Sequence, residues 1–158
     1  MLGQYTKWLE NITIGLLLLT IFTIFTDVVL RYVFNNSSIT IQEMGWHLFS
    51  AMFLLGISYT LQHDAHVRVD VFYAQFEVKK QAWINIIGFV IFILPISVLI
   101  IYDGIDFYYQ AFLLNEQSGD PGGLPYRFII KGIIPLSFIL LIISGLIFTQ
   151  NNFKKIKS

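Results

Sequence analysis

Asp27 and Arg31 lie at the end of a long apolar stretch, in the segment FTDVVLRYVFN that runs from Phe25 to Asn35. A charge within hydrocarbon is costly, so the pair needs either a neutralising contact or a role in transport. Residues four apart on a helix are neighbours and can form an ion pair. Thr13 and Thr20 precede Asp27 at intervals of seven, which places all four residues on one narrow stripe. We interpret the stripe as a self-paired couple on a buried seam; an ion or proton relay is the alternative.

A second polar stripe follows on the next apolar segment. Glu43, His47 and Ser50 share one helical face, and Glu43 and His47 are again four residues apart. His47 could ligate haem, but a bis-histidine site needs a partner at similar depth, and His63 and His66 lie at the other end of the same segment. The run His63-Asp64-Ala65-His66 has the spacing of metal ligands but lacks a further ligand cluster. We therefore expect no metal or cofactor in this chain, and we assign the stripe to a subunit interface.

The composition is that of an integral membrane protein. Of the 158 residues, 56% are hydrophobic and only 13% are charged, whereas a soluble domain has about 25% charged residues. The net charge of zero does not suggest nucleic-acid binding, and the lack of cysteine excludes thiol chemistry and cysteine-ligated metals. No nucleophile–base pair, phosphate loop or carboxylate dyad is recognisable, so we do not expect an enzyme.

The sequence contains four candidate membrane spans, and crossing a bilayer requires about 20 mostly apolar residues in each. The predicted fold is a single all-α membrane domain over residues 1–158, with N- and C-termini on the same side. The first span reaches full length only if its helix continues through Asp27 and Arg31 to Phe34, after which Asn35-Asn36-Ser37-Ser38 forms a turn. Asp103 and Asp106 are expected as solvated acids at the outer end of the third span. The predicted spans cover residues 11–34, 44–62, 81–102 and 132–153.

The basic residues predict the orientation. On the side of the termini stand Lys7, Arg68, Lys79, Lys80, Lys154, Lys155 and Lys157. The other side has Arg31, Arg127 and Lys131. By the positive-inside rule, seven against three places both termini in the cytoplasm.

The connection between the second and third spans is predicted to lie along the membrane surface. Residues 69–80 place Phe72 and Phe76 on one face of a helix, as in an amphipathic interfacial segment. Trp8, Trp46 and Trp83 stand near predicted span ends, where tryptophan rings fix the depth of a helix.

The sequence also resembles a known family. Arg31-Tyr32-Val33-Phe34-Asn35, Glu43 at the opening of the second span, Gly56, and His66-Val67-Arg68-Val69-Asp70 are similar in order and spacing to the small membrane subunit of tripartite ATP-independent periplasmic (TRAP) transporters. The similarity extends over four spans, from about Leu9 to Asn151. The family often has paired acids at the start of the second span, where this chain has only Glu43.

The resemblance implies a division of labour among three proteins. A periplasmic substrate-binding protein captures a small carboxylate, and a large membrane subunit imports it together with sodium ions, moving its transport domain like an elevator. The small subunit is a scaffold in the bacterial cytoplasmic (inner) membrane and transports nothing itself. By position, Arg31, Glu43, His66, Arg68 and Asp70 match the family pattern, and we assign them structural and interface roles.

Two other functions are compatible with the residues. A stand-alone proton-coupled multidrug exporter would have four spans and a membrane carboxylate, for which Asp27 is the candidate. A membrane anchor of a redox enzyme would bind haem or a quinone. Transport by the isolated chain would indicate the exporter, and a Soret band would indicate the haem protein.

Overall fold

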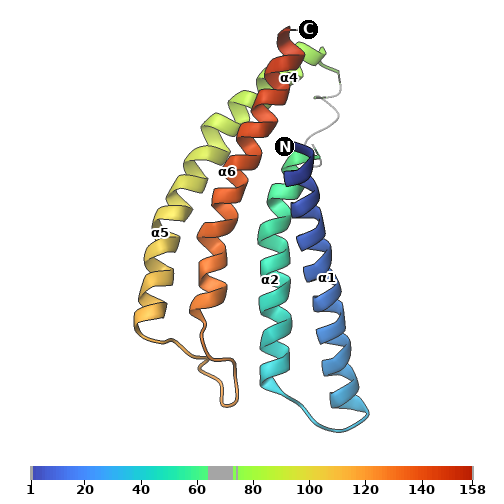
Figure 1. Cartoon of the computed structure of the whole chain (residues 1–158), viewed down its shortest axis with the longest axis vertical. Coiled ribbons are helices and arrows are strands. Elements are labelled where there is room, and N and C mark those ends of the chain that lie inside the picture. The colour runs from blue at the N-terminus through green and yellow to red at the C-terminus, as the bar shows by residue number, and fades with distance from the viewer. Residues whose placement is uncertain (1, 64–72, 74, 158) are drawn as a thin grey trace.

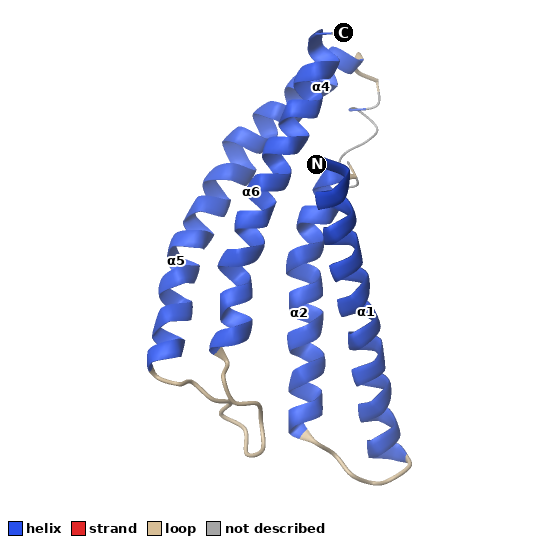
Figure 2. Cartoon of the chain, in the orientation of Figure 1, coloured by secondary structure: helices blue, strands red, loops and turns tan. Residues whose placement is uncertain are grey.

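The computed structural model describes residues 2–63, 73 and 75–157, and the regular structure of these residues is entirely helical (Figure 2). The chain forms α1 (Leu2–Tyr32), α2 (Ile39–Gln62), α4 (Val78–Gly88), the π-helical turn η1 (Phe89–Ile93), α5 (Leu94–Leu113) and α6 (Phe128–Lys157). Because α4, η1 and α5 are continuous, these elements make four helices long and apolar enough to cross a membrane. The predicted all-α fold with four spans is confirmed.

The helices extend beyond the apolar runs that revealed them. The third runs from Val78 to Leu113, about 54 Å at 1.5 Å per residue, whereas the sequence predicts residues 81–102. Asp103 and Asp106 therefore lie well inside a helix and not at its outer end. The predicted span ends before its first charged residue, Asp103. The helix itself continues, because backbone hydrogen bonds form past that point wherever charged side chains can reach water.

α1 ends two residues before the predicted position. The last helical residue is Tyr32, Asn35 adopts a left-handed φ of 51°, and the Asn36 N–H donates to the Leu30 carbonyl at 3.0 Å. Helices commonly end at a residue in the left-handed conformation, which asparagine tolerates better than most residues.

The helices form an open row in which α2 and α6 are central. α1 packs on α2, α2 on α6, and α6 on both α4 and α5 (Figure 1). The connections 33–38 and 114–127 lie at one end, here called the loop end. α1 begins and α6 ends toward the opposite, terminal end (Figure 1). α1 and α5, at the two edges of the row, leave most of their surface for lipid or for another protein.

Leu61 of α2 and Leu141 and Phe148 of α6 form a buried apolar cluster. The buried polar side chains include four serines with at most 2% of their surface exposed, Ser58, Ser97, Ser137 and Ser144. Small residues allow helix backbones to approach closely within a membrane, where no hydrophobic force drives helices together.

Side-chain hydrogen bonds tie the first hairpin, formed by α1 and α2, to α6 near these serines. The Tyr5 hydroxyl donates to the Leu140 carbonyl at 3.0 Å and lies 3.0 Å from Ser144 Oγ. The Gln62 side chain donates to the Ser144 carbonyl at 2.8 Å. Three helices therefore meet at Ser144.

The π-helical turn precedes Pro95 in the same span. Proline has no N–H to donate and its ring crowds the preceding turn, so a widened turn accommodates it without breaking the helix. The Ser97 hydroxyl donates to the Ile93 carbonyl at 2.6 Å and satisfies one acceptor there.

Residues 64–72 and 74, which include the first part of the predicted interfacial segment 69–80, lie outside the described residues. Val78, Lys79 and Lys80 belong to the first turn of α4, and the interfacial orientation of residues 69–80 stays a prediction. The cytoplasmic placement of the termini is likewise a prediction.

Candidate docking face

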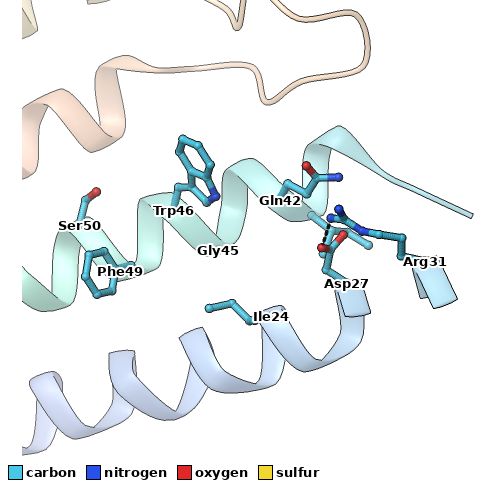
Figure 3. Close-up of a pocket in the computed structure, with 9 residues that line it drawn as sticks. Ile24, Asp27, Arg31, Gln42, Gly45, Trp46, Phe49 and Ser50 are labelled. Carbon is cyan, nitrogen blue, oxygen red and sulfur yellow. Dashed lines mark hydrogen bonds and ion pairs between the residues drawn. The ribbon is translucent and has the colours of Figure 1, made fainter. Parts of the chain in front are cut away.

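The Asp27 and Arg31 side chains form the ion pair that their spacing predicts (Figure 3). The Asp27 side chain is 13% exposed and the Arg31 side chain 43%. The acid is therefore mostly covered, while the longer guanidinium reaches toward the surface at the loop end. Each charge is neutralised by the other, which lowers the cost of their position near the end of a membrane helix.

The ion pair closes one end of a groove of about 570 Å³ between α1 and α2. Figure 3 shows Gln42 beside the charged pair, with Ile24, Phe49 and Ser50 farther along the groove. α1 and α2 approach closely at the floor of the groove, where a Cβ on Gly45 would lie 3.6 Å from Ile24 Cγ1. Trp46, 76% exposed, forms part of its wall.

Two further grooves adjoin the first one on the other side of α2. One, of about 620 Å³, lies between α2 and the 114–127 loop and is lined by Glu43, His47, Asp120 and Arg127. The other, of about 480 Å³, is nearly all apolar and lies among α2, α5 and α6. Ser50 lines all three grooves. We call this continuous surface the groove face, formed by Asp27, Gln42, Trp46, His47, Phe49, Ser50, Phe53, Arg127, Ile130 and Ile134.

The groove face continues onto α5. A hollow of about 430 Å³ shares Ile100 and Ile134 with the apolar groove and is bordered by Asp103 and Asp106. Gln110 donates a hydrogen bond to Asp106 at 2.7 Å. Acidic and amide side chains thus line the same hollow as apolar side chains.

Glu43 makes its contacts within the chain. The Ser118 hydroxyl donates to Glu43 Oε1, and the Leu124 N–H donates to Oε2 at 2.6 Å. Gly123 packs against this carboxylate, because a Cβ there would overlap Ser118 and come within 2.9 Å of Glu43 Oε2. Glu43 therefore holds the 114–127 loop, which connects α5 to α6, against the beginning of α2.

Other contacts hold the same loop in place. The Thr40 hydroxyl donates to the carbonyl of Gly122, whose φ of +83° favours glycine. Glu116 forms an ion pair with Lys131, whose Nζ also lies 3.8 Å from the centroid of the Phe107 ring. The sequence does not predict that Ser118, Leu124 and Lys131 are the partners, because the Gly122-Gly123 pair between Pro121 and Pro125 indicates only tight turns.

The two threonines of the first stripe contact the chain itself. Thr13 donates to the Leu9 carbonyl at 2.8 Å, and its methyl group faces Gly56 of α2. Thr20 is 4% exposed and donates to the Leu16 carbonyl at 2.7 Å. The residues of the predicted seam therefore fall into three groups. Thr13 and Thr20 donate hydrogen bonds within α1, and Glu43 binds the loop. The grooves are bordered by Asp27, Arg31, His47 and Ser50.

The remaining predicted residues fall into two groups. His66, Arg68, Asp70 and Phe72 lie outside the described residues. Trp8, Trp83 and Phe76 are exposed, as anchors at a membrane surface require, and their anchoring role stays a prediction. Within the part of the chain that the structure describes, no three histidine or acidic side chains are grouped closely enough to hold a metal ion.

Four membrane-length helices with a polar, grooved face define a multi-pass membrane protein. The sequence model of the DctQ component of tripartite ATP-independent periplasmic transporters matches residues 8–154, so the chain belongs to this family. A comparison with curated proteins gives no match. The chain is therefore the small membrane component of a TRAP transporter.

Proposed function

We propose that this subunit is a stationary scaffold that transports nothing itself, and that its groove face holds helices of the large membrane subunit. The polar side chains of that face support the proposal. Lipid tails cannot hydrogen-bond Gln42, His47 or Ser50, whereas a neighbouring protein helix can. Apolar side chains of the same face, such as Phe49 and Phe53, are more than half exposed and supply packing area.

The family supports a particular setting for this scaffold. The large subunit carries a small carboxylate together with sodium ions, and a periplasmic protein delivers the substrate. The small subunit lies in the bacterial inner membrane with both termini in the cytoplasm, holds no cofactor and catalyses no reaction.

The shape of the row suits a scaffold physically. An elevator moves one domain against another that stays fixed in the bilayer. A row four helices wide presents a broad lipid-facing area, and tryptophans near the helix ends resist vertical displacement. The Ser144 junction and the Glu43 contacts hold the two hairpins together at opposite ends. A force that the partner exerts on the groove face is then distributed over all the helices of the row.

Filling the groove tests the proposal. Ser50 lines all three grooves, so Ser50→Trp places a large ring where partner side chains would pack. We expect the tagged variant to lose most of the large subunit in a mild-detergent pull-down. The matched control is Leu18→Trp, at a 61% exposed position of α1. Equal recovery of the large subunit with both variants would refute the assignment of this face.

Reconstitution separates the scaffold from the other two functions. Vesicles containing only this chain should accumulate no solute, whereas an exporter would respond to a proton gradient. Purified chain should show no Soret band, whereas a haem-binding anchor would. Membership of a transporter-component family favours the scaffold over both.

A further inference from the structure

Five lysines gather at the terminal end, where α4 begins beside the last turns of α6 (Figure 1). Lys79 and Lys80 stand in the first turn of α4, and Lys154, Lys155 and Lys157 stand in the last turns of α6. All five are exposed. Two segments more than seventy residues apart in sequence thus build one basic surface, here called the lysine cluster.

The packing of α4 on α6 fixes the cluster. Asn85 donates to the side-chain oxygen of Asn152 at 3.1 Å, and Asn152, only 1% exposed, donates to the Phe148 carbonyl at 2.9 Å. One step nearer the terminal end, the rings of Trp83 and Phe153 meet edge to face at 6.4 Å. Continuing this antiparallel register by one turn places Lys79 and Lys80 level with the end of α6.

Among the residues that the structure describes, no carboxylate forms an ion pair with these lysines. In the described part of the chain the ion pairs are Asp27–Arg31 and Glu116–Lys131, both distant from the cluster. The neighbouring acid, Glu77, is exposed and makes no side-chain cap to α4. The partial positive charge at the beginning of α4 adds to that of Lys79 and Lys80. Like charges on two adjacent helix ends repel one another unless an anion lies between them.

The depth of the cluster indicates which anion binds. Trp83 and Phe153 are 48% and 44% exposed and lie between the lysines and the apolar part of their spans. Aromatic rings in such positions mark the boundary between headgroups and hydrocarbon. The lysines one turn farther out are therefore level with the lipid phosphates.

We propose that the lysine cluster, formed by Lys79, Lys80, Lys154, Lys155 and Lys157, binds the phosphate groups of anionic phospholipids and retains these lipids around α4 and α6. Lysine is a compact, flexible cation that binds phosphate as a point charge. Clusters of basic residues directly beyond a membrane span attract anionic lipids. The Trp83–Phe153 pair provides an apolar surface for the upper part of the acyl chains.

Native mass spectrometry of the full chain tests the proposal. The purified protein in neutral detergent receives equal amounts of phosphatidylglycerol and phosphatidylcholine with the same acyl chains. We expect the wild type to retain phosphatidylglycerol preferentially. Changing all five lysines to glutamine should lower this preference by about tenfold or more. Circular dichroism checks that the exposed substitutions leave the helices intact.

Two controls make the result decisive. Changing the five lysines to arginine keeps the charge and should keep the lipid preference, whereas Lys7→Gln, at the exposed beginning of α1, should not alter it. An unchanged preference in the glutamine variant would overturn the proposal. Displacement of phosphatidylglycerol by added inorganic phosphate would also overturn it, because the cluster would then be a site for soluble anions.

Discussion

The Phe89 ring of the π-helical turn lies directly against the backbone of Gly145 in α6, so a Cβ on Gly145 would overlap the ring edge. Phe89 is 2% exposed, and Gly145 is buried. Two more glycines make similar contacts between these spans. Pro135 packs on Gly104, and its Cδ would lie 3.3 Å from a Cβ added there. The Tyr108 ring packs on Gly132, where an added Cβ would lie 3.0 Å from the ring. These contacts set the spacing between α6 and the continuous helix of α4, η1 and α5, because the rings fill the space that the glycines leave.

We predict that Gly145→Ala destabilises the chain because the Phe89 ring has no free space into which to move. Overpacking a close contact costs about 1–3 kcal/mol, and thermal unfolding in detergent would measure it. The control is Gly88→Ala, since an added Cβ there meets nothing within 4 Å. Alanine is the better helix former by about 1 kcal/mol, so Gly88→Ala should leave the melting temperature unchanged or raise it. Equal melting temperatures for the two variants would contradict the prediction.

The contacts of Glu43 with the 114–127 loop lead to a second prediction. Glu43→Ala removes the acceptor of the Ser118 hydroxyl and the Leu124 N–H. Because the loop then loses both hydrogen bonds to this carboxylate, we expect it to open locally more often and the Leu124 amide to exchange clearly faster than in the wild type. Hydrogen–deuterium exchange of the loop peptides would measure this.

A suitable control for the loop is Asp120→Ala. Asp120 is exposed, and its hydrogen bonds are made by its backbone, to Ser118 Oγ and from the Gly123 N–H. This substitution should leave exchange at Leu124 close to that of the wild type. Fast exchange in the control and slow exchange in Glu43→Ala would show that another contact holds the loop.

The Tyr5 hydroxyl provides a third prediction. It donates to the Leu140 carbonyl beside Ser144, in the part of the molecule where three helices meet. Tyr5→Phe keeps the ring and removes the hydroxyl, so we expect a loss of about 1 kcal/mol in the free energy of unfolding. Tyr32→Phe, at a 76% exposed position, should cost nothing measurable. The difference between the two melting temperatures measures the contribution of the Tyr5 contact.

The sequence predicts the four spans because the requirement for about 20 apolar residues is local and strong. It does not predict where the helices end, since backbone hydrogen bonds continue past the last apolar residue. For the third span, Asp103 marks a change in composition, yet the helix continues to Leu113. The π-helical turn also escapes prediction, because Pro95 indicates only some distortion and the packing of Phe89 on Gly145 is a tertiary effect.

The candidate site shows the same division between local and distant contacts. Asp27 and Arg31 are four residues apart, so helical geometry alone predicts their ion pair. Glu43 has the same local pattern with His47, but its partners Ser118 and Leu124 are 75 and 81 residues away. No periodicity within α2 contains that information. The sequence predicts polar residues on one face but cannot distinguish those that bind this chain from those left for another protein.

The Asp27–Arg31 pair provides the last prediction, because its two members are unequally covered. Arg31→Ala leaves the mostly covered Asp27 carboxylate unpaired, whereas Asp27→Ala leaves a guanidinium that can extend into water. We expect Arg31→Ala to cost about 1–3 kcal/mol in the free energy of unfolding, Asp27→Ala to cost less, and the double variant to be more stable than Arg31→Ala alone. Because the pair borders the groove face, recovery of the large subunit and substrate uptake by the assembled transporter should fall in the same order. If both single variants retain the large subunit and normal uptake, the pair only neutralises itself and has no part in holding the partner.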